Sequence, residues 1–236
     1  EPMQAALNRM LEQVNQLLAR EQRFIADAAH ELRTPLAVLQ IHAENALESR
    51  DPAERDQALM HLRKGVERAT RLVSQMLTLA RLADEQQRQR VSVGLLQTCR
   101  NEVAELLPLA LRKQQDLSFD SEPDLPPEVQ MEPGSLAMLL QNLIGNAIQH
   151  TPAGGQIRVS LSSQQQTVAL CVEDSGHGVL EAERQRLLER FHAQGSSQGA
   201  GLGLSIVQRI TERHRGRLTL AESPLGGLLV RVEWSI

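Results

Sequence analysis

Two long stretches near the start of the chain carry apolar residues at every third or fourth position. This spacing gathers apolar side chains on one face of an α-helix and therefore predicts two amphipathic helices. The first begins with a heptad-like seam and continues beyond it, through Leu7, Leu11, Val14, Leu18, Ile25, Ala28 or Ala29, Leu32, Leu36, Leu39, Ala43 and Ala46. The second runs through Leu59, Leu62, Val66, Ala69, Val73, Met76 and Ala80.

The break between the two helices lies at Arg50-Asp51-Pro52, where Asp51 can cap a helix that starts at Pro52. Two such helices enclose a core poorly, whereas pairing with a second copy into a four-helix bundle would bury both seams. The alternative is a purely structural helical pair. The polar, non-periodic run from Asp84 to Arg90 predicts a domain boundary after the hairpin.

The first helix carries His30 on the face opposite its apolar stripe. His30 precedes Leu32 by two residues, which is roughly 200° around a helix, and Thr34 lies one turn later on the same exposed face. Glu31 is adjacent in sequence, and Pro35 should bend or loosen the helix because it lacks an N–H. An exposed imidazole can act as a nucleophile or a switch, although an inert polar face is the simpler interpretation.

From residue 91 the pattern changes to alternating strands and helices. Two extended, alternating segments joined by a Gln-rich turn predict a pair of antiparallel strands, at residues 156–162 and 167–173. Prolines at 133 and 152 bound a predicted helix between them, and a proline-rich loop covers residues 123–127. Further strands are expected at 91–93, 117–119, 217–221 and 227–234, and further helices within 95–114, 180–189 and 202–214. The fold expected here is an α/β sandwich with a mixed, largely antiparallel sheet.

Three polar or glycine-rich stretches of this second part suit a nucleotide. Asn142, Asn146 and His150 recur at four-residue steps on one helix face, and an Asn oxygen suits Mg²⁺ that phosphates already hold. Asp174 follows a strand in a turn with two glycines; its carboxylate can accept a hydrogen bond from an exocyclic amine. The third stretch is a glycine-rich loop that enters a helix, where backbone N–H groups attract phosphate: Gly199, Gly201 and Gly203. The alternatives are a solvated helix face, a tight turn and a flexible helix-capping loop.

Two familiar nucleotide fingerprints are missing from the sequence. It holds no GxxxxGK[ST], and the Gly199 stretch reads GxGxGL without a strand directly before it. The net charge of -4 argues against nucleic acid as the main partner. Cys99 and Cys171 are far apart and are expected to be free thiols of a reducing compartment. No apolar run approaches the ~18 residues of a membrane span.

With its His-bearing hairpin and its ordered Asn, Asp-Gly and Gly-rich stretches, the chain resembles the cytoplasmic catalytic region of a bacterial two-component sensor histidine kinase. The resemblance covers nearly all 236 residues. It implies a HisKA-type helical hairpin that dimerises into a four-helix bundle, followed by a GHKL (Bergerat) α/β sandwich that binds ATP and Mg²⁺. The implied limits are residues 1–20 for the end of a membrane-proximal signalling helix, 21–86 for the dimerisation and phosphotransfer domain, and 87–236 for the ATP-binding domain.

The resemblance also implies roles for individual residues. His30 would be phosphorylated, Glu31 would orient or deprotonate its imidazole, and Thr34 would position water in a phosphatase reaction. Asn146 would bind Mg²⁺ and Asp174 the adenine amine. The remaining nucleotide contacts would come from Asn142, Gly176, Gly178, Arg190 and Phe191 of the F-box, and Gly199, Gly201 and Gly203 beside the lid at 192–200. The family often has Pro where His177 stands, and the lid is short and uncharged, so the cation that faces the phosphates stays open.

The implied function is ATP-dependent autophosphorylation on His30, transfer to an Asp of a response regulator receiver domain, and phosphatase activity on that regulator. The implied assembly is a homodimer, as the cytoplasmic portion of an inner-membrane protein whose spans lie outside this sequence. Two other classes stay open: a GHKL ATPase of the chaperone or topoisomerase kind, and a non-catalytic dimeric scaffold.

Overall fold

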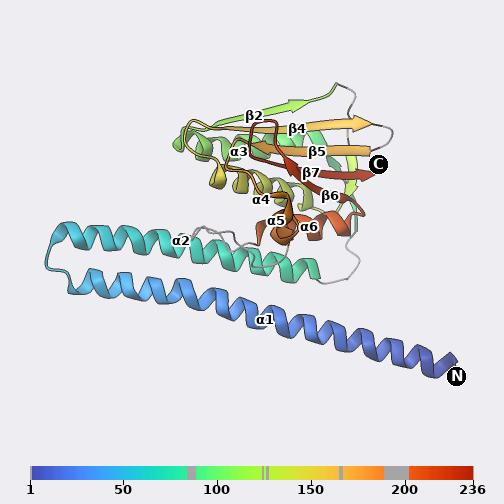
Figure 1. Ribbon diagram of the computed structural model, residues 1–236, viewed down its shortest axis with the longest axis horizontal. Helices are drawn as coiled ribbons and strands as arrows, with labels where there is room; N and C mark the ends of the chain where they lie inside the picture. The colour runs from blue at the N-terminus through green and yellow to red at the C-terminus, as the bar shows by residue number, and fades with distance from the viewer. Residues whose placement is uncertain are drawn as a thin grey trace. The chain divides into compact units, whose positions relative to one another are not determined.

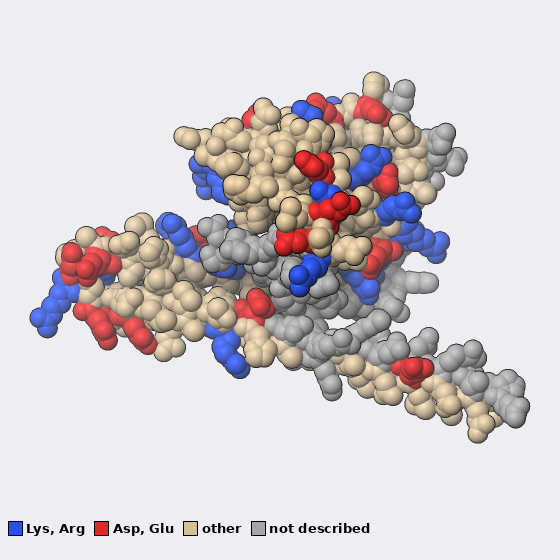
Figure 2. All heavy atoms as spheres, in the orientation of Figure 1, with Lys and Arg blue, Asp and Glu red and all other residues tan. Residues whose placement is uncertain are grey.

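The computed structural model describes residues 2–83, 89–123, 125, 128–164, 167–188 and 202–235 (Figure 1). The chain divides into two compact units, residues 1–76 and 77–236. None of the described helices is long and apolar enough to cross a membrane. Figure 2 shows Lys and Arg side chains interspersed with Asp and Glu over the visible described surface.

The first unit is the predicted helical hairpin. It is formed by α1 (Pro2–Glu48) and by α2 (Pro52–Ala83) as far as Met76. The predicted cap of α2 is confirmed, because Asp51 Oδ1 accepts a hydrogen bond from the Ala53 N–H at 2.9 Å. Pro35 lies inside α1 and does not end it.

The two helices approach closely where Leu39 meets Gly65. A Cβ atom added at Gly65 would lie 2.6 Å from Leu39 Cδ2, so the missing side chain makes room for Leu39. Apolar residues on the facing sides of the hairpin are buried or half-buried: Leu32, Leu39, Ala43 and Ala46 of α1, and Ala58, Leu62, Ala69, Leu72 and Met76 of α2.

Other members of the predicted stripes remain exposed in the single chain. Their exposed fractions lie between 40% and 60%, for Ile25, Leu36, Leu59, Val66 and Val73. The prediction of one stripe per helix was therefore too simple. Each helix has one apolar seam facing its neighbour in the hairpin and another that the hairpin leaves uncovered.

The second unit is an α/β sandwich. Its main sheet has the order β2-β4-β5-β7-β6, in which β2 pairs parallel with β4 and all other pairs are antiparallel. The strands are β2 (Asp116–Ser121), β4 (Gln156–Gln164), β5 (Thr167–Asp174), β6 (Arg217–Glu222) and β7 (Leu228–Ser235). The mixed, largely antiparallel sheet expected from the sequence is confirmed.

Helices form the second layer of the sandwich (Figure 1). The central helix α4 (Ser135–His150) packs against α3 (Leu95–Arg112) on one side and α6 (Gly203–Arg213) on the other. Alternate residues of the strands point into the core between the layers. The core is aliphatic apart from Trp234: Leu136, Leu140, Leu143, Ile144, Ile157, Val159, Leu161, Leu170, Ile206, Ile210, Val232 and Trp234.

Three details differ from the sequence prediction. A short strand, β3 (Glu128–Met131), was not predicted; it pairs antiparallel with β1 (Val91–Gly94). The helix predicted at 180–189 is only one turn, α5 (Glu181–Arg184), followed by a 3₁₀ turn at Arg186–Leu188, because no residue of either buries a side chain. Gly227, predicted to open the last strand, lies in the turn before β7.

A polar junction joins the end of α6 to the start of this unit. The largely buried side chains of Arg213 and Glu132 form an ion pair, and Arg213 Nη1 donates to the Leu82 carbonyl at 3.1 Å. His214 Nε2 accepts from the Glu132 N–H at 3.0 Å, while Nδ1 lies 2.8 Å from the Ile210 carbonyl. An amide can only donate and a carbonyl can only accept, so this ring is neutral with its proton on Nδ1.

We expect the second unit to lose stability as the pH falls below about 6.5, the ordinary pKa of a histidine in an unfolded chain. Burial lowers the pKa of His214, so the unfolded chain binds more protons than the folded chain between the two pKa values. The contribution of neutral His214 to the unfolding free energy is therefore complete above about pH 6.5. It is lost as the pH falls toward the pKa of His214 in the folded chain. Urea unfolding at pH 7.5 and at pH 5.5, followed by the fluorescence of Trp234, the only tryptophan, measures the difference in unfolding free energy.

The matched variant is His214→Gln, whose amide oxygen can still accept from the Glu132 N–H but does not titrate. The fall in unfolding free energy between the two pH values should be smaller in His214→Gln than in the parent chain. Equal falls in the two proteins would contradict the assignment.

Candidate active site

Asp174, the last residue of β5, is only 7% exposed and is held in place by backbone amides. Its Oδ1 accepts hydrogen bonds from the Gly176 N–H at 2.8 Å and from the Leu228 N–H at 3.2 Å. No hydrogen bond to Oδ2 occurs among the described residues. The fold thus fixes Oδ1, and Oδ2 can accept a hydrogen bond from a donor group of a ligand, such as an amine.

Two turns enclose this carboxylate. One is the turn after β5, where a Cβ at Gly176 would lie 2.7 Å from the His150 carbonyl oxygen. The other is the β6–β7 turn, where the Gly227 N–H donates to the Asp174 carbonyl at 3.0 Å. A Cβ at Gly227 would overlap Asp174 Oδ1 and lie 2.5 Å from Gly176 N. Both positions require glycine, because a Cβ at Gly176 would meet the His150 backbone and a Cβ at Gly227 would meet Asp174.

The sequence prediction included Gly176 and Gly178 but missed Gly227. Gly178 has φ +65°, a left-handed conformation that favours glycine, and faces the Gly227 carbonyl. The consecutive glycines 226 and 227, between two strands, were the available signal. The strand predicted to begin at residue 227 obscures this signal.

Helix α4 connects the polar stretches. Asn146 faces the start of α6, where a Cβ at Gly203 would lie 2.9 Å from its Nδ2, so the predicted residues Asn146 and Gly203 are in contact. At the end of α4, His150 lies against Gly176 through its carbonyl oxygen. Asn142 behaves differently: its Nδ2 donates to the Met138 carbonyl of its own helix at 2.8 Å.

The start of α6 is suited to an anion. Gly203 is the first residue of this 11-residue helix, and its opening N–H groups have no acceptor within the helix. Such groups, together with the helix dipole, attract phosphate. The predicted contacts Arg190, Phe191, Gly199 and Gly201, and the lid at 192–200, lie outside the described residues.

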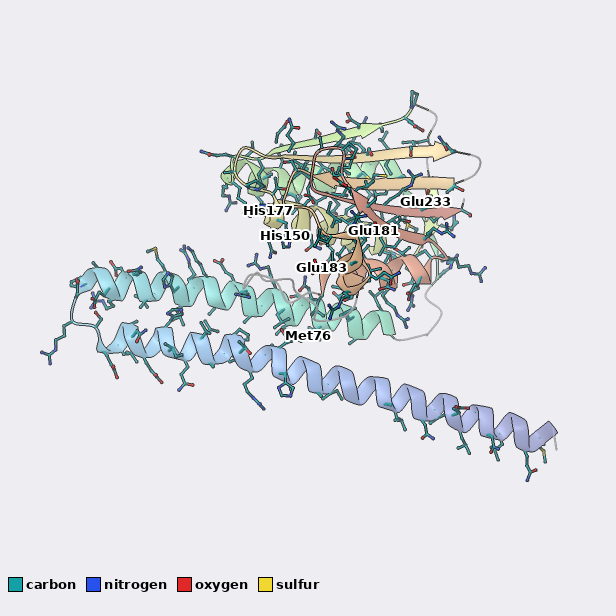
Figure 3. All side chains as sticks on the ribbon, viewed as in Figure 1. Met76, His150, His177, Glu181, Glu183 and Glu233 are labelled. Carbon is teal, nitrogen blue, oxygen red and sulfur yellow. The ribbon has the colours of Figure 1, made fainter. Side chains whose placement is uncertain are left out.

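His150 and His177 lie near one another (Figure 3), and the charge of Asp174 acts on the His150 ring. Desolvation of the ring lowers the pKa of His150, the Asp174 charge opposes this, and Lys113 and His177 lower it further. A neutral imidazole beside the Asp174 carboxylate is a flat, uncharged surface. Because the pKa of His150 is also lowered in the folded chain, His150 should add to the loss of stability in acid that is expected from His214.

The helical unit carries the other predicted group. His30 and Thr34 are exposed on α1, one turn apart, which confirms the exposure predicted from the spacing. Glu31 is half-buried, and the structure shows no hydrogen bond between it and His30. The imidazole is therefore accessible to a reactant.

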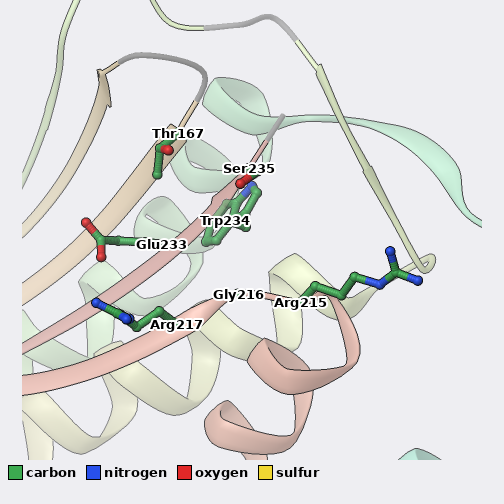
Figure 4. A pocket seen from close by; sticks show the side chains of 7 residues that line it. All are labelled: Thr167, Arg215, Gly216, Arg217, Glu233, Trp234 and Ser235. Carbon is green, nitrogen blue, oxygen red and sulfur yellow. The ribbon is translucent and has the colours of Figure 1, made fainter.

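A separate cavity of about 350 Å³ lies at the other end of β5 (Figure 4). Thr167 begins this strand and Asp174 ends it, so the two places are about 23 Å apart along an extended strand. The cavity is lined by Thr167, Arg215, Gly216, Arg217, Glu233, Trp234 and Ser235. It is not part of the site around Asp174.

The fold and site define a class: a helical hairpin with an exposed histidine, followed by a GHKL-type α/β sandwich with a glycine-enclosed carboxylate. Residues 20–85 match the His Kinase A (phospho-acceptor) domain, and residues 131–236 match the histidine kinase-, DNA gyrase B-, and HSP90-like ATPase family. The chain belongs to the sensor histidine kinases of two-component systems.

Relatives of known type agree with this assignment. The chain is 39% identical over 231 residues to the sensor protein kinase PmrB of Pseudomonas aeruginosa, over 96% of this chain and 48% of PmrB. It is 34% identical over 237 residues to the sensor protein QseC of Escherichia coli K12, over 99% of this chain and 52% of QseC. The crystal structure of full-length ShkA in complex with AMPPNP superposes with a TM-score of 0.65 at 26% identity, over 90% of this chain and 45% of ShkA. The chain spans about half the length of the curated relatives it matches.

Proposed function

We propose that this chain transfers the γ-phosphoryl group of ATP to a ring nitrogen of His30. The bond from the γ-phosphorus to its bridging oxygen breaks, a P–N bond forms, and the imidazole N–H proton is released as ADP leaves. The observation that carries the proposal is the Asp174 carboxylate, fixed through Oδ1 and open at Oδ2 inside a glycine-lined turn. An adenine amine is a donor of the kind that this oxygen can bind.

The phosphates of ATP would lie at the start of α6. Its N–H groups suit anionic oxygens, and Asn146, in contact with Gly203, presents a neutral oxygen ligand there. Asn146 would thereby hold Mg²⁺, which supplies neutralisation of phosphate charge when bound. Because phosphoryl transfer leaves little covalent chemistry to the protein, binding and positioning by these residues account for most of the catalysis. ShkA holds the ATP analogue AMPPNP, which supports this use of the domain.

The exposed face of α1 supports two further steps. The phosphorylated His30 would pass its phosphoryl group to an Asp of a response regulator receiver domain, and Glu31 would orient the imidazole or accept its proton. Thr34 lies one turn beyond His30 on the same exposed face and would position water for hydrolysis of the phospho-regulator. Relatives of this chain are named as sensor proteins, which supports a response regulator as its partner.

The uncovered apolar seam supports a homodimer. The exposed residues Leu36, Leu59, Val66 and Val73 would be buried if two hairpins formed a four-helix bundle. Residues 21–86 would then be the dimerisation and phosphotransfer domain, 87–236 the ATP-binding domain, and 1–20 the end of a membrane-proximal helix. In a longer protein anchored in the inner membrane, this region would form the cytoplasmic portion.

Incubation with γ-labelled ATP and Mg²⁺ tests the proposal against the two other classes. A histidine kinase incorporates label that is labile in acid and stable in alkali. A GHKL ATPase of the chaperone or topoisomerase kind releases labelled phosphate without incorporation, and a scaffold does neither. Either of the last two outcomes would overturn the proposed function.

We expect Asn146→Ala to remove labelling while leaving the oligomer unchanged. The substitution deletes the oxygen proposed for Mg²⁺ and lies in the second compact unit, whereas the hairpin forms the first. Label incorporation should fall by about 10²-fold or more, as for other losses of a group that stabilises transition-state charge. The molar mass in solution, measured by light scattering, should match that of the parent chain, and a shift to monomers would contradict this assignment.

A further inference from the structure

Two histidines face one another across the helical hairpin, outside the site already described. The His42 ring of α1 and the His61 ring of α2 have centroids 5.1 Å apart, with their planes tilted by 57°. Both belong to the first compact unit, and His42 is half-buried while His61 is exposed. Nothing in the proposed phosphoryl transfer uses this pair.

The separation of the two ring centroids is compatible with a shared metal ion. A Zn²⁺–N bond of about 2.0–2.1 Å places the ion about 3.2 Å from the centroid of a coordinating imidazole. Two imidazoles at a tetrahedral angle then have centroids roughly 5.2 Å apart. The observed centroid distance of 5.1 Å is close to this value.

The surroundings leave the ring nitrogens available. Neither ring makes a hydrogen bond to another described residue. Two charged side chains near the pair in sequence interact elsewhere: Glu44 accepts from Gln40 at 2.9 Å, and Arg63 pairs with Glu67 at 3.9 Å. The exposed edge of His61 admits a hydrated ion. No third His, Cys, Asp or Glu joins the pair among the described residues, so water completes the coordination.

The backbone near the pair is already fixed. Leu39, three residues before His42, packs against Gly65, which lies four residues after His61. The two helices are therefore in close contact one turn from the histidine pair. The two ligands therefore need little ordering when an ion binds. A pre-arranged pair loses less conformational entropy on binding than two freely rotating side chains.

We propose that His42 and His61 form a binding site for a divalent transition-metal ion of the Zn²⁺ type. The ion connects α1 to α2 through one imidazole nitrogen of each. The site lies 12 residues beyond His30, or about 18 Å along the helix, so it is distinct from the phospho-acceptor. A bound ion resists sliding of one helix against the other and stabilises the folded hairpin.

Titration of the untagged chain with Zn²⁺ by calorimetry tests the site. We expect one saturable ion per protomer, with affinity reduced tenfold or more in His42→Asn and in His61→Asn, since loss of even an outer-sphere partner costs that much. Co²⁺ should give the visible absorption of a tetrahedral complex in the parent chain, and this band should be lost in both variants.

His30→Gln is the matched control, because it removes an exposed histidine from the same unit and should leave Zn²⁺ affinity unchanged. Helix content by circular dichroism establishes that each variant is folded. Zn²⁺ should also raise the thermal midpoint of the helical signal by about 3 °C or more, without shifting the fluorescence transition of Trp234 in the other unit. Absence of saturable binding, or equal affinity in the parent and both variants, would overturn the proposal.

Discussion

Replacement of Gly227 by alanine should greatly weaken ATP binding. A Cβ atom at this position would overlap Asp174 Oδ1 and lie 2.5 Å from both the Asp174 carbonyl oxygen and Gly176 N. These neighbours are backbone atoms and a buried carboxylate, so none of them can move aside cheaply. The β6–β7 turn must therefore shift, and Asp174 loses the arrangement in which one oxygen is fixed and the other is open. We expect the affinity for ATP to fall by about 100-fold or more, which corresponds to about 2.7 kcal/mol.

Gly145→Ala is the matched control, because it makes the same substitution within α4. A Cβ at Gly145 has no heavy atom within 4 Å, and alanine in a helix is more stable than glycine by about 0.5–1 kcal/mol. Calorimetry with ATP should therefore separate the two variants, while Trp234 fluorescence checks that each is folded. Asp174→Asn provides a second variant that keeps the shape of the side chain and should also lose ATP affinity. Parent-like binding by both Gly227→Ala and Asp174→Asn would show that Asp174 does not hold the nucleotide.

Replacement of His30 by glutamine should eliminate the acid-labile label completely. Glutamine is neutral and polar, so it suits the exposed position on α1, but it offers no nucleophilic ring nitrogen. ATP affinity should remain that of the parent chain, because His30 and Asp174 belong to different compact units. The measurement is filter-bound label after alkaline and acid treatment, beside nucleotide binding by calorimetry.

His61→Gln controls for the removal of an exposed histidine from the same hairpin. It should retain the label, because His61 lies on α2 and is not the proposed nucleophile. Acid-labile label that persists in His30→Gln would place the phosphorylated residue elsewhere and would contradict the proposed role of His30.

The helical hairpin and the exposure of His30 could both be predicted from the sequence. A helix repeats every 3.6 residues, so the face on which Leu32 or Thr34 lies follows from its spacing from His30 alone. The cap at Asp51 and the strand pair β4–β5 are likewise local, because a few neighbouring residues specify them. In these places the short-range preference and the final fold agree.

Other features depend on residues that are far apart in the sequence. Gly227 contacts Asp174 only because β7 pairs with β5, and the pairing of β3 with β1 joins segments separated by all of α3. The division of each apolar stripe into two seams also required the packed hairpin.

The amino-acid sequence by itself thus determined most of the helices and strands, the exposed imidazole and the acid at the end of β5. Only the tertiary structure decided that Gly227 closes over Asp174 and that His42 faces His61. The physical reason is that side-chain periodicity is set by the local backbone, whereas contact between distant segments is set by how their elements pack together.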